Sequence, residues 1–210
     1  PISFSIRAFP ASGYSGEELV HRLLNHPCAA LTAITSRQFA DQALSKIFPR
    51  FTGQGVADTL KFTEPDPSIL AQTAEIVFLA LPHGAAAEYT QELLENDIRV
   101  IDLSADFRLR NPAVYEEFYG DKHPAPNLLK EAVYGLPELY RKEIHAAKLV
   151  ASPGCYPTSI LLPTVPLLKA GLIKPTGIIA NSLSGVSGAG RNKDSSFLYA
   201  ECNESARPYS

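Results

Sequence analysis

Cys155 lies in the stretch ASPGCYPTS, residues 151–159, between a segment typical of a strand and an apolar segment typical of a helix. A cysteine at the start of a helix lies at the positive end of the helix dipole, which favours the thiolate. Because a thiolate is a strong nucleophile toward acyl carbons, the sequence predicts Cys155 as a catalytic nucleophile. The alternative is a small buried apolar side chain, an interpretation that suits Cys28 and Cys202, whereas a nearby glycine and proline mark a strand-to-helix corner at Cys155.

A second chemical signal is PASGYSG, residues 10–16, which follows a predicted strand and opens a predicted helix. Small residues there let a backbone approach a pyrophosphate, and the free amides of a helix terminus bind it. The stretch therefore indicates a nucleotide site. The alternative is an ordinary glycine turn before a capped helix.

A third signal is TSRQ, residues 35–38, which follows the second predicted strand. Sites that prefer NAD usually carry an acidic residue here for the ribose 2′-hydroxyl, whereas an arginine suits a 2′-phosphate. Ser36 and Arg37 therefore fit NADP, and the alternative is a solvated turn.

The elements that must position these residues alternate between strand and helix patterns. Strand patterns occupy 2–9, 31–36, 74–81, 99–104 and 146–150, and helix patterns occupy 15–26, 84–96 and 159–172. This alternation predicts an α/β fold with a parallel sheet, which binds ligands at the carboxyl ends of its strands.

Two local patterns predict how the helices begin and end. Ser15 is the predicted N-cap of the first helix, with Glu18 as its capping-box partner. Pro163 and Pro166 predict that the helix after Cys155 kinks or ends early.

The composition is that of an ordinary soluble globular protein. Of 210 residues, 45% are hydrophobic and 20% charged, with a formal net charge of −3. This balance gives no reason to expect nucleic acid or an anionic membrane as a partner, and no apolar run reaches the roughly 18 residues that span a bilayer. The three widely spaced cysteines form neither a disulfide framework nor a zinc site, so we expect a cytoplasmic protein without a metal.

Five histidines are present. His83, in LPHG, follows a predicted strand, where loops carry function, and is a candidate site residue. We expect solvated or structural roles for the other four, which are His21, His26, His123 and His145.

Six stretches occur in one order along the chain: ASGYSGEEL, FLALPHG, VIDLSADFRL, VYGLPEL, ASPGCYPTS and SGVSGAGR. Together they resemble the N-acetyl-γ-glutamyl-phosphate reductases, which are related to the aspartate-semialdehyde dehydrogenases. The resemblance covers almost the whole chain, and the stretch around Cys155 is its most specific part.

The resemblance implies a Rossmann-like, mostly parallel NADP-binding domain at 1–153 and the first part of an α+β catalytic domain at 154–210. It implies that Cys155 is the nucleophile. The implied cofactor-binding residues are Ser12, Gly13, Tyr14, Ser15, Gly16, Ser36, Arg37, Leu81 and Pro82. The implied substrate-side residues are Ser184, Gly185, Ser187, Gly188 and Tyr209, to which its place at a strand end adds His83.

The implied reaction is the reduction of N-acetyl-γ-glutamyl phosphate in arginine biosynthesis. The Cys155 thiolate attacks the acyl carbon, phosphate leaves, and hydride from NADPH reduces the thioester to the semialdehyde. Another acyl phosphate, such as aspartyl phosphate, is an alternative substrate. A cysteine hydrolase needs no dinucleotide loop, so the match at 11–16 counts against that class. The resemblance also implies a homo-oligomer.

The chain departs from the family pattern at four positions. Arg7 and Pro10 stand where fingerprint glycines are usual, and Asn181 and Leu183 stand where an Asp and a Lys are frequent.

The family's general acid–base histidine lies beyond the position of Ser210. We therefore expect a longer natural protein, in which case this chain alone would be a ligand-binding fragment without turnover. In such a fragment the predicted strand 177–185 would have an unpaired edge, and the helix at 158–168 would have an uncovered apolar face.

Overall fold

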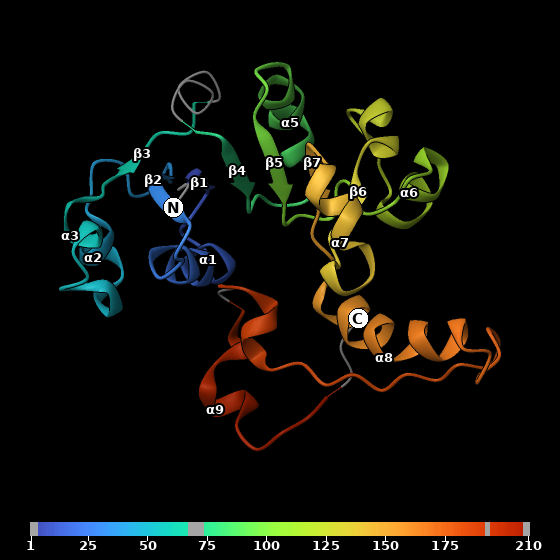
Figure 1. Ribbon diagram of the computed structural model, residues 1–210. Coiled ribbons are helices and arrows are strands. Elements are labelled where there is room, and N and C mark those ends of the chain that lie inside the picture. Colours follow the sequence, from blue (N-terminus) through green and yellow to red (C-terminus); the bar gives the residue numbers. More distant parts are fainter. Residues whose placement is uncertain (1–3, 67–73, 192–193, 208–210) are drawn as a thin grey trace.

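The computed structural model describes residues 4–66, 74–191 and 194–207. Seven strands form one sheet in the order β3-β2-β1-β4-β5-β7-β6, and every neighbouring pair is parallel (Figure 1). The strands are β1 (Phe4–Phe9), β2 (Ala29–Thr35), β3 (Phe62–Thr63), β4 (Ile76–Leu79), β5 (Arg99–Asp102), β6 (Val133–Tyr134) and β7 (Leu149–Ala151). The predicted parallel α/β fold is confirmed.

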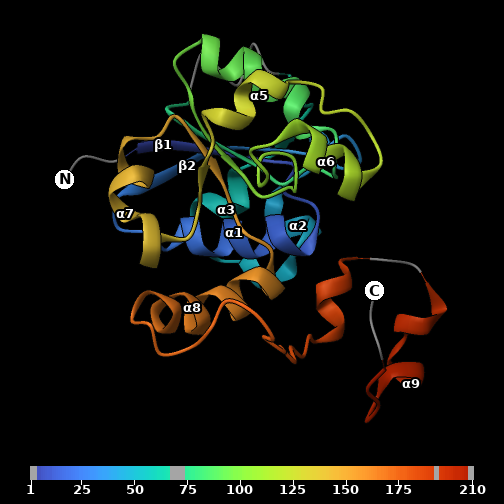
Figure 2. The same ribbon diagram turned by 90° about the vertical axis from the view of Figure 1, so that its right-hand side faces the viewer.

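Helices cover both faces of the sheet (Figure 2). The α-helices are α1 (Tyr14–Leu24), α2 (Leu44–Ile47), α3 (Val56–Thr59), α5 (Ala86–Glu95), α6 (Pro112–Tyr119), α7 (Pro137–Ala146), α8 (Cys155–Lys169) and α9 (Tyr199–Cys202). Short 3-10 turns are η1 (Pro49–Phe51), η2 (Pro126–Lys130), η3 (Val186–Ala189) and η4 (Ser195–Phe197). One core packs α1, α2 and α3 against the sheet, and the other packs α5 and η2 against the opposite face.

Strand β4 shows why a continuous apolar run forms a central strand. Val77 and Leu79 belong to the core on the α5 face, whereas Ile76 and Phe78 pack on the α1 face. Because successive side chains of a strand point to opposite faces, both faces of β4 must be apolar when helices cover both.

The start of α1 differs from the prediction. The N-cap is Gly13, which makes no side-chain cap, and the helix begins at Tyr14. Ser15 therefore lies inside the first turn, and the predicted capping box of Ser15 and Glu18 is wrong. The Glu18 carboxylate instead accepts from Arg22, one helical turn further on.

Helix α8 continues through both of its prolines. It runs from Cys155 to Lys169 with Pro163 and Pro166 inside it, so the expected early end is wrong. Each proline lacks an amide donor, but the bonds at the helix ends remain, such as Ala170 N to Pro166 O at 3.0 Å.

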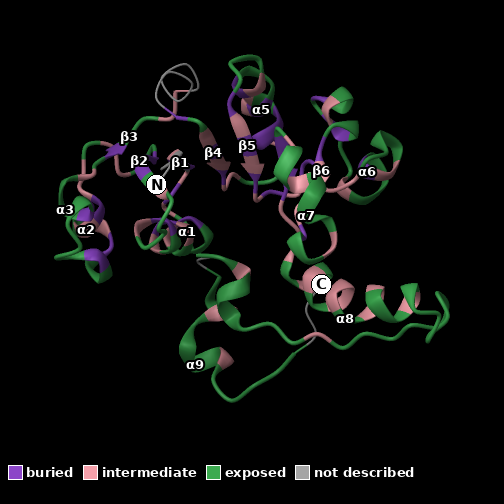
Figure 3. Ribbon diagram, viewed as in Figure 1, coloured by how far each residue is buried: buried purple, intermediate pink, exposed green. Residues whose placement is uncertain are grey.

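The chain after α8 has no buried residue among those described (Figure 3). The predicted strand at 177–185 is absent, because no neighbouring strand pairs with this stretch in the part of the chain that the structure describes. Large apolar side chains are exposed here, including Ile179 at 88% and Leu183 at 96%. The expected uncovered face of helix 158–168 is also present, since α8 has no buried residue.

Candidate functional site

The site lies at the carboxyl edge of the sheet. Strand order reverses at β1, because β2 and β3 extend to one side of it and β4, β5 and β7 to the other. In open parallel sheets, ligands bind in the crevice at such a switch point. The loops after β1, β2, β4, β5 and β7 carry most of the predicted site residues to this edge (Figure 1).

The loop after β1 is built around a close approach at Gly16. A Cβ there would lie 2.6 Å from Ala11 Cα and 2.8 Å from Pro10 O, so only glycine fits against the loop backbone. Gly13, by contrast, has nothing within 4 Å of an added Cβ. Ser12 is half-buried, and Gly13, Tyr14 and Ser15 are exposed.

The first amides of α1 are free to bind an anion. Glu17 N is the first amide to bond back along the helix, to Gly13 O at 2.8 Å. The amides of Tyr14, Ser15 and Gly16 precede it and have no intrahelical partner, as at any helix start. The free amides, the positive end of the dipole and the open space at Gly13 fit a dinucleotide phosphate.

Arg7 and Pro10 do not block this loop. Ile6 and Ala8 belong to the core beneath α1, and Arg7 pairs with Val77, which faces the α5 side. The Arg7 side chain therefore points away from α1, where burial lowers its pKa and its Nε has no hydrogen-bond partner. Pro10 loses an amide donor, but the next residue, Ala11, keeps its bond to Thr35 O at 3.0 Å.

The loop after β2 places Ser36 and Arg37 differently. Ser36 is buried, and its amide donates to Thr63 O at 3.0 Å, which fixes the end of β2 against β3. Arg37 is exposed, and its Nη2 lies 3.4 Å from Tyr89 Oη on α5. The guanidinium is therefore available at the sheet edge, while Ser36 acts through the backbone.

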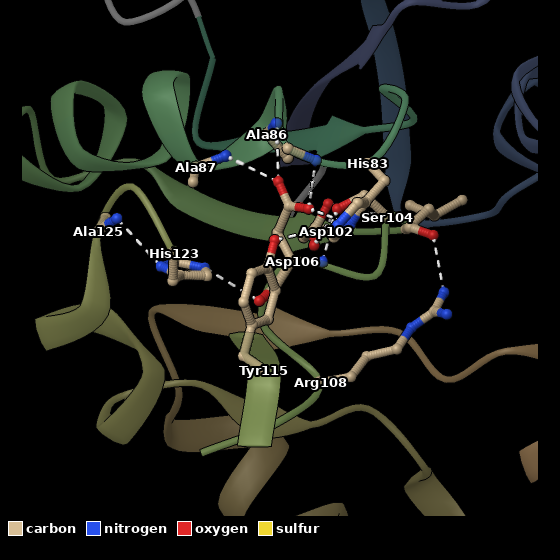
Figure 4. A network of polar contacts seen from close by, with 12 residues as sticks. His83, Ala86, Ala87, Asp102, Ser104, Asp106, Arg108, Tyr115, His123 and Ala125 are labelled. Carbon is tan, nitrogen blue, oxygen red and sulfur yellow. Dashed lines mark hydrogen bonds and ion pairs between the residues drawn. The ribbon is translucent and has the colours of Figure 1, made fainter. Parts of the chain in front are cut away.

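The loop after β4, residues 80–85, is held by a carboxylate from the loop after β5 (Figure 4). Asp106 is fully buried, and its Oδ1 accepts from Gly84 N at 2.7 Å. Its Oδ2 accepts from Ala86 N at 3.0 Å and from Ala87 N at 3.2 Å. The loop contains Leu81, which is half-buried, and Pro82, which is exposed.

His83 in this loop has both ring nitrogens engaged. Nδ1 lies 3.0 Å from Asp106 Oδ1, and Nε2 lies 3.2 Å from Tyr115 Oη. Burial raises the pKa of Tyr115 to about 12, so the phenol beside Nε2 keeps its proton. The ring also packs on Tyr119, with 4.4 Å between centroids. The arrangement suits a positioning histidine rather than one free to exchange protons with a substrate.

Asp102, at the end of β5, is a second buried carboxyl in the same loop region. Ser104 donates to it from its amide at 2.9 Å and from its hydroxyl at 2.8 Å. Burial outweighs these bonds and raises the pKa of Asp102 to about 6.

Cys155 is the first residue of α8, exposed, with Gly154 as the N-cap, so its predicted place at a strand-to-helix corner is confirmed. Arg108 lies beside this corner, with Nη1 3.3 Å from the position of a Cβ on Gly154. Its Nε donates to Ser152 O at 2.8 Å and its Nη2 to Leu103 O at 3.0 Å. Arg108 and the start of α8 together make the surroundings of Cys155 electropositive.

Sequence reasoning missed Asp106 and Arg108 as residues of this site. Both lie in VIDLSADFRL, a stretch quoted only for its resemblance. An Asp and an Arg in the largely apolar stretch directly after a strand were the available signal, because charged residues in apolar surroundings are usually paired.

The chain after α8 runs back along that helix and on toward α1 (Figures 1 and 2). Ser182 Oγ lies 2.9 Å from Ser159 Oγ of α8. Arg191 then reaches α1, where its Nη2 bonds Glu17 at 2.8 Å and its guanidinium covers the Tyr14 ring at 4.9 Å. This contact between the end of SGVSGAGR and the start of α1 had no sequence signal.

Four of the predicted substrate-side residues lie between those two contacts. A Cβ on Gly188 would lie 2.4 Å from Ser184 Oγ, so the loop closes on itself there. All four, Ser184, Gly185, Ser187 and Gly188, are exposed. Tyr209 lies outside the described residues.

These features define a Rossmann-type α/β protein with a helix-tip cysteine at the carboxyl edge of its sheet. Residues 10–147 match the family described as semialdehyde dehydrogenase, NAD binding domain, and residues 155–210 match semialdehyde dehydrogenase, dimerisation domain. The chain therefore belongs to the semialdehyde dehydrogenase family.

Two curated relatives with high identity to this chain have the same name. The chain is 56% identical over 200 residues to an N-acetyl-gamma-glutamyl-phosphate reductase of Akkermansia muciniphila, and 48% identical over 199 residues to that of Nitrosococcus oceani. Each match covers 95% of this chain and 57% of the relative. The chain thus spans little more than half the length of these curated relatives.

Solved structures share the fold at low identity. Aspartate semialdehyde dehydrogenase of Candida albicans with NADP superposes with a TM-score of 0.60 at 14% identity, covering 81% of this chain and 48% of that one. Aspartate semialdehyde dehydrogenase II of Vibrio cholerae gives 0.57 at 17% identity, covering 80% and 47%. Across the described part of the chain, no helix is long and apolar enough to cross a membrane.

Proposed function

We propose that this chain is part of an NADP-dependent reductase that converts N-acetyl-γ-glutamyl phosphate to N-acetyl-glutamate γ-semialdehyde, in arginine biosynthesis. The observation that carries the proposal is the sheet order. The start of α1 follows β1 and Cys155 follows β7, with only β4 and β5 between them. Three strand spacings are about 14 Å, so a dinucleotide bound along this edge can reach the thiol.

Cys155 performs the acyl transfer in this proposal. Its sulfur bonds to the acyl carbon of the substrate while the bond from that carbon to the phosphate oxygen breaks, leaving a thioester and free phosphate. The start of α8 and Arg108 stabilise the negative charge that develops there, because both present positive charge at the edge. When NADPH is bound, it supplies the hydride that reduces the thioester. Release of the sulfur then frees the semialdehyde.

Different residues of this chain bind different parts of the cofactor. The amides at residues 12–16 hold the pyrophosphate, and Ser36 fixes the turn from which Arg37 reaches the 2′-phosphate. Leu81 and Pro82 lie in the loop after β4, the next strand toward Cys155, and contact the nicotinamide ribose.

The remaining assignments concern the second part of the chain. We assign residues 1–153 to the cofactor domain and 154–210 to the start of the catalytic domain. Ser184, Gly185, Ser187, Gly188, Tyr209 and His83 form the substrate side. A homo-oligomer is supported by the family description of 155–210 and by the exposed apolar side chains there. The small-molecule substrate and the biosynthetic role suit a cytoplasmic enzyme.

Replacement of Cys155 tests the proposal directly. In the full-length protein, Cys155→Ser should lower acyl-phosphate reduction with NADPH by at least about 1,000-fold, because a serine hydroxyl without a base is a weak nucleophile. Its thermal transition should stay at the wild-type temperature, since the side chain is exposed. Cys28→Ser is the matched control and should keep full activity. Substantial activity in Cys155→Ser would refute the assignment.

A second candidate function is reduction of aspartyl phosphate. Two solved structures that match are named aspartate semialdehyde dehydrogenase, and at 14% and 17% identity they show only the shared fold. A direct comparison of kcat/KM for both acyl phosphates decides the substrate, and a preference for aspartyl phosphate would overturn the choice made here.

A further inference from the structure

Asp106, a buried residue in the loop after β5, binds the loop after β4 and the start of α5. Three amides donate to its carboxylate, those of Gly84, Ala86 and Ala87, and Nδ1 of His83 lies 3.0 Å from its Oδ1 as an ion-pair contact (Figure 4). A carboxylate has about four acceptor positions, so the three amides use most of its capacity. All four groups come from a single stretch, residues 83–87, about 20 positions earlier in the chain.

This carboxylate takes the place of a local helix cap. Ala85 is the N-cap of α5 and has no side chain that could bind the first amides of the helix. Asp106 binds two of them and adds a negative charge at the positive end of the α5 dipole. Gly84 has φ +84°, a conformation that L side chains rarely adopt, so the loop depends on contacts that hold it there.

The backbone of Asp106 is held by hydrogen bonds at both its amide and its carbonyl. Its amide donates to Ser104 Oγ at 3.1 Å, and that hydroxyl donates to Asp102 at 2.8 Å. Its carbonyl accepts from His123 Nε2 at 3.0 Å, while His123 Nδ1 accepts from Ala125 N at 3.0 Å. His123 is therefore held in a single tautomer, and the carboxylate is presented from a rigid support.

We propose that Asp106 is a positioning residue for the cofactor site. It fixes the loop 80–85 relative to β5 and thereby sets where Leu81 and Pro82 lie at the sheet edge. It also holds His83 in one orientation, with Tyr115 Oη hydrogen-bonded to the opposite ring nitrogen. The link to the cofactor rests on the function proposed above, whereas the control of the loop conformation does not.

Asp106→Asn in the full-length protein tests both parts. An amide group replaces one acceptor oxygen by a donor, so at least one of the three amides that Asp106 binds loses its partner. Exchange of the amides of residues 84–87 with deuterium should accelerate by about 10- to 100-fold, the scale of one hydrogen bond to a charged group. The Kd for NADPH, measured from the change in NADPH fluorescence on binding, should rise about tenfold. The kcat at saturating NADPH should fall less than about threefold.

Two further variants separate positioning from simple destabilisation. Leu93→Ala removes a fully buried side chain about two helical turns along α5 from the amides that Asp106 binds, so it should lower the thermal transition but leave NADPH binding unchanged. His83→Ala removes the imidazole but not the backbone contacts, and should weaken NADPH less than Asp106→Asn.

The outcomes distinguish the two proposals. Exchange of residues 84–87 in Asp106→Asn no faster than in Leu93→Ala would overturn the control of the loop. Equal NADPH affinity in wild type and Asp106→Asn would overturn the positioning of the cofactor site. A wild-type protein that binds no NADPH would refute the proposed function and the cofactor half of this inference, and exchange would still decide the loop.

Discussion

Gly16→Ala tests whether the close approach of α1 to the loop after β1 is required. The new Cβ would lie 2.6 Å from Ala11 Cα, whereas carbon atoms in contact normally lie about 3.5–4.0 Å apart. The obstruction is backbone rather than a flexible side chain, so α1 must move by about 1 Å. Overpacking of this kind costs about 1–3 kcal/mol, which outweighs the gain of up to about 1 kcal/mol from replacing a helical glycine by alanine.

The net loss should lower the thermal transition by about 2–6 °C in a protein of this size. Gly13→Ala is the matched control, because its Cβ meets nothing within 4 Å and its φ of −86° suits alanine. The control should melt at the wild-type temperature, yet weaken NADPH if the open space at Gly13 receives the cofactor. Calorimetry measures the first quantity and fluorescence titration the second. A Gly16→Ala transition equal to that of the control would refute the steric reasoning.

Three further predictions concern single side chains. Arg37→Ala should weaken NADP binding about 10- to 100-fold and NAD binding little, and an equal loss for both by titration would remove Arg37 from the site. Iodoacetamide should label Cys155 before Cys28, which peptide mass spectrometry would detect, and equal labelling would argue against an activated thiolate. Because the pKa of Asp102 is raised to about 6 from 3.8, its contribution to stability is present below pH 3.8 and lost as pH rises through 6. The free energy of unfolding of Asp102→Asn, measured by urea denaturation, should therefore rise relative to that of wild type by up to about 3 kcal/mol between pH 4 and pH 7. A difference between the two proteins that stays constant with pH would contradict the raised pKa.

The order of the main elements could be predicted because their sequence patterns are strong. The run at 74–81 is apolar on both faces and became β4, and the alternation with helices gave the parallel sheet. The short elements β3 and β6 have two residues each and carry no periodicity from which to predict them. The stretch at 177–185 has strand-like composition, but composition alone provides no partner for backbone hydrogen bonds.

The candidate site could be predicted only where a motif is local. Cys155 and residues 12–16 each lie at a strand-to-helix corner, so position along the chain is enough to find them. The contact of Arg191 with Glu17 joins residues 174 positions apart, and the bond from Asp106 to Gly84 joins loops of two different strands. Such pairs depend on strand order, which the sequence pattern alone does not determine.

Asp102 and Asp106 show why burial alone does not reveal what a carboxyl does. Both are fully buried and lie four positions apart in one stretch. Asp106 accepts from three amides and lies at the positive end of the α5 dipole, with Nδ1 of His83 3.0 Å from its Oδ1, so a negative charge on it is stabilised by these groups. Among the described residues, Asp102 accepts hydrogen bonds only from Ser104, and burial dominates its pKa. At pH 7, Asp102→Asn should therefore stabilise the protein. Asp106→Asn should destabilise it, because the Asp106 carboxylate holds another loop in place and the Asp102 carboxylate does not.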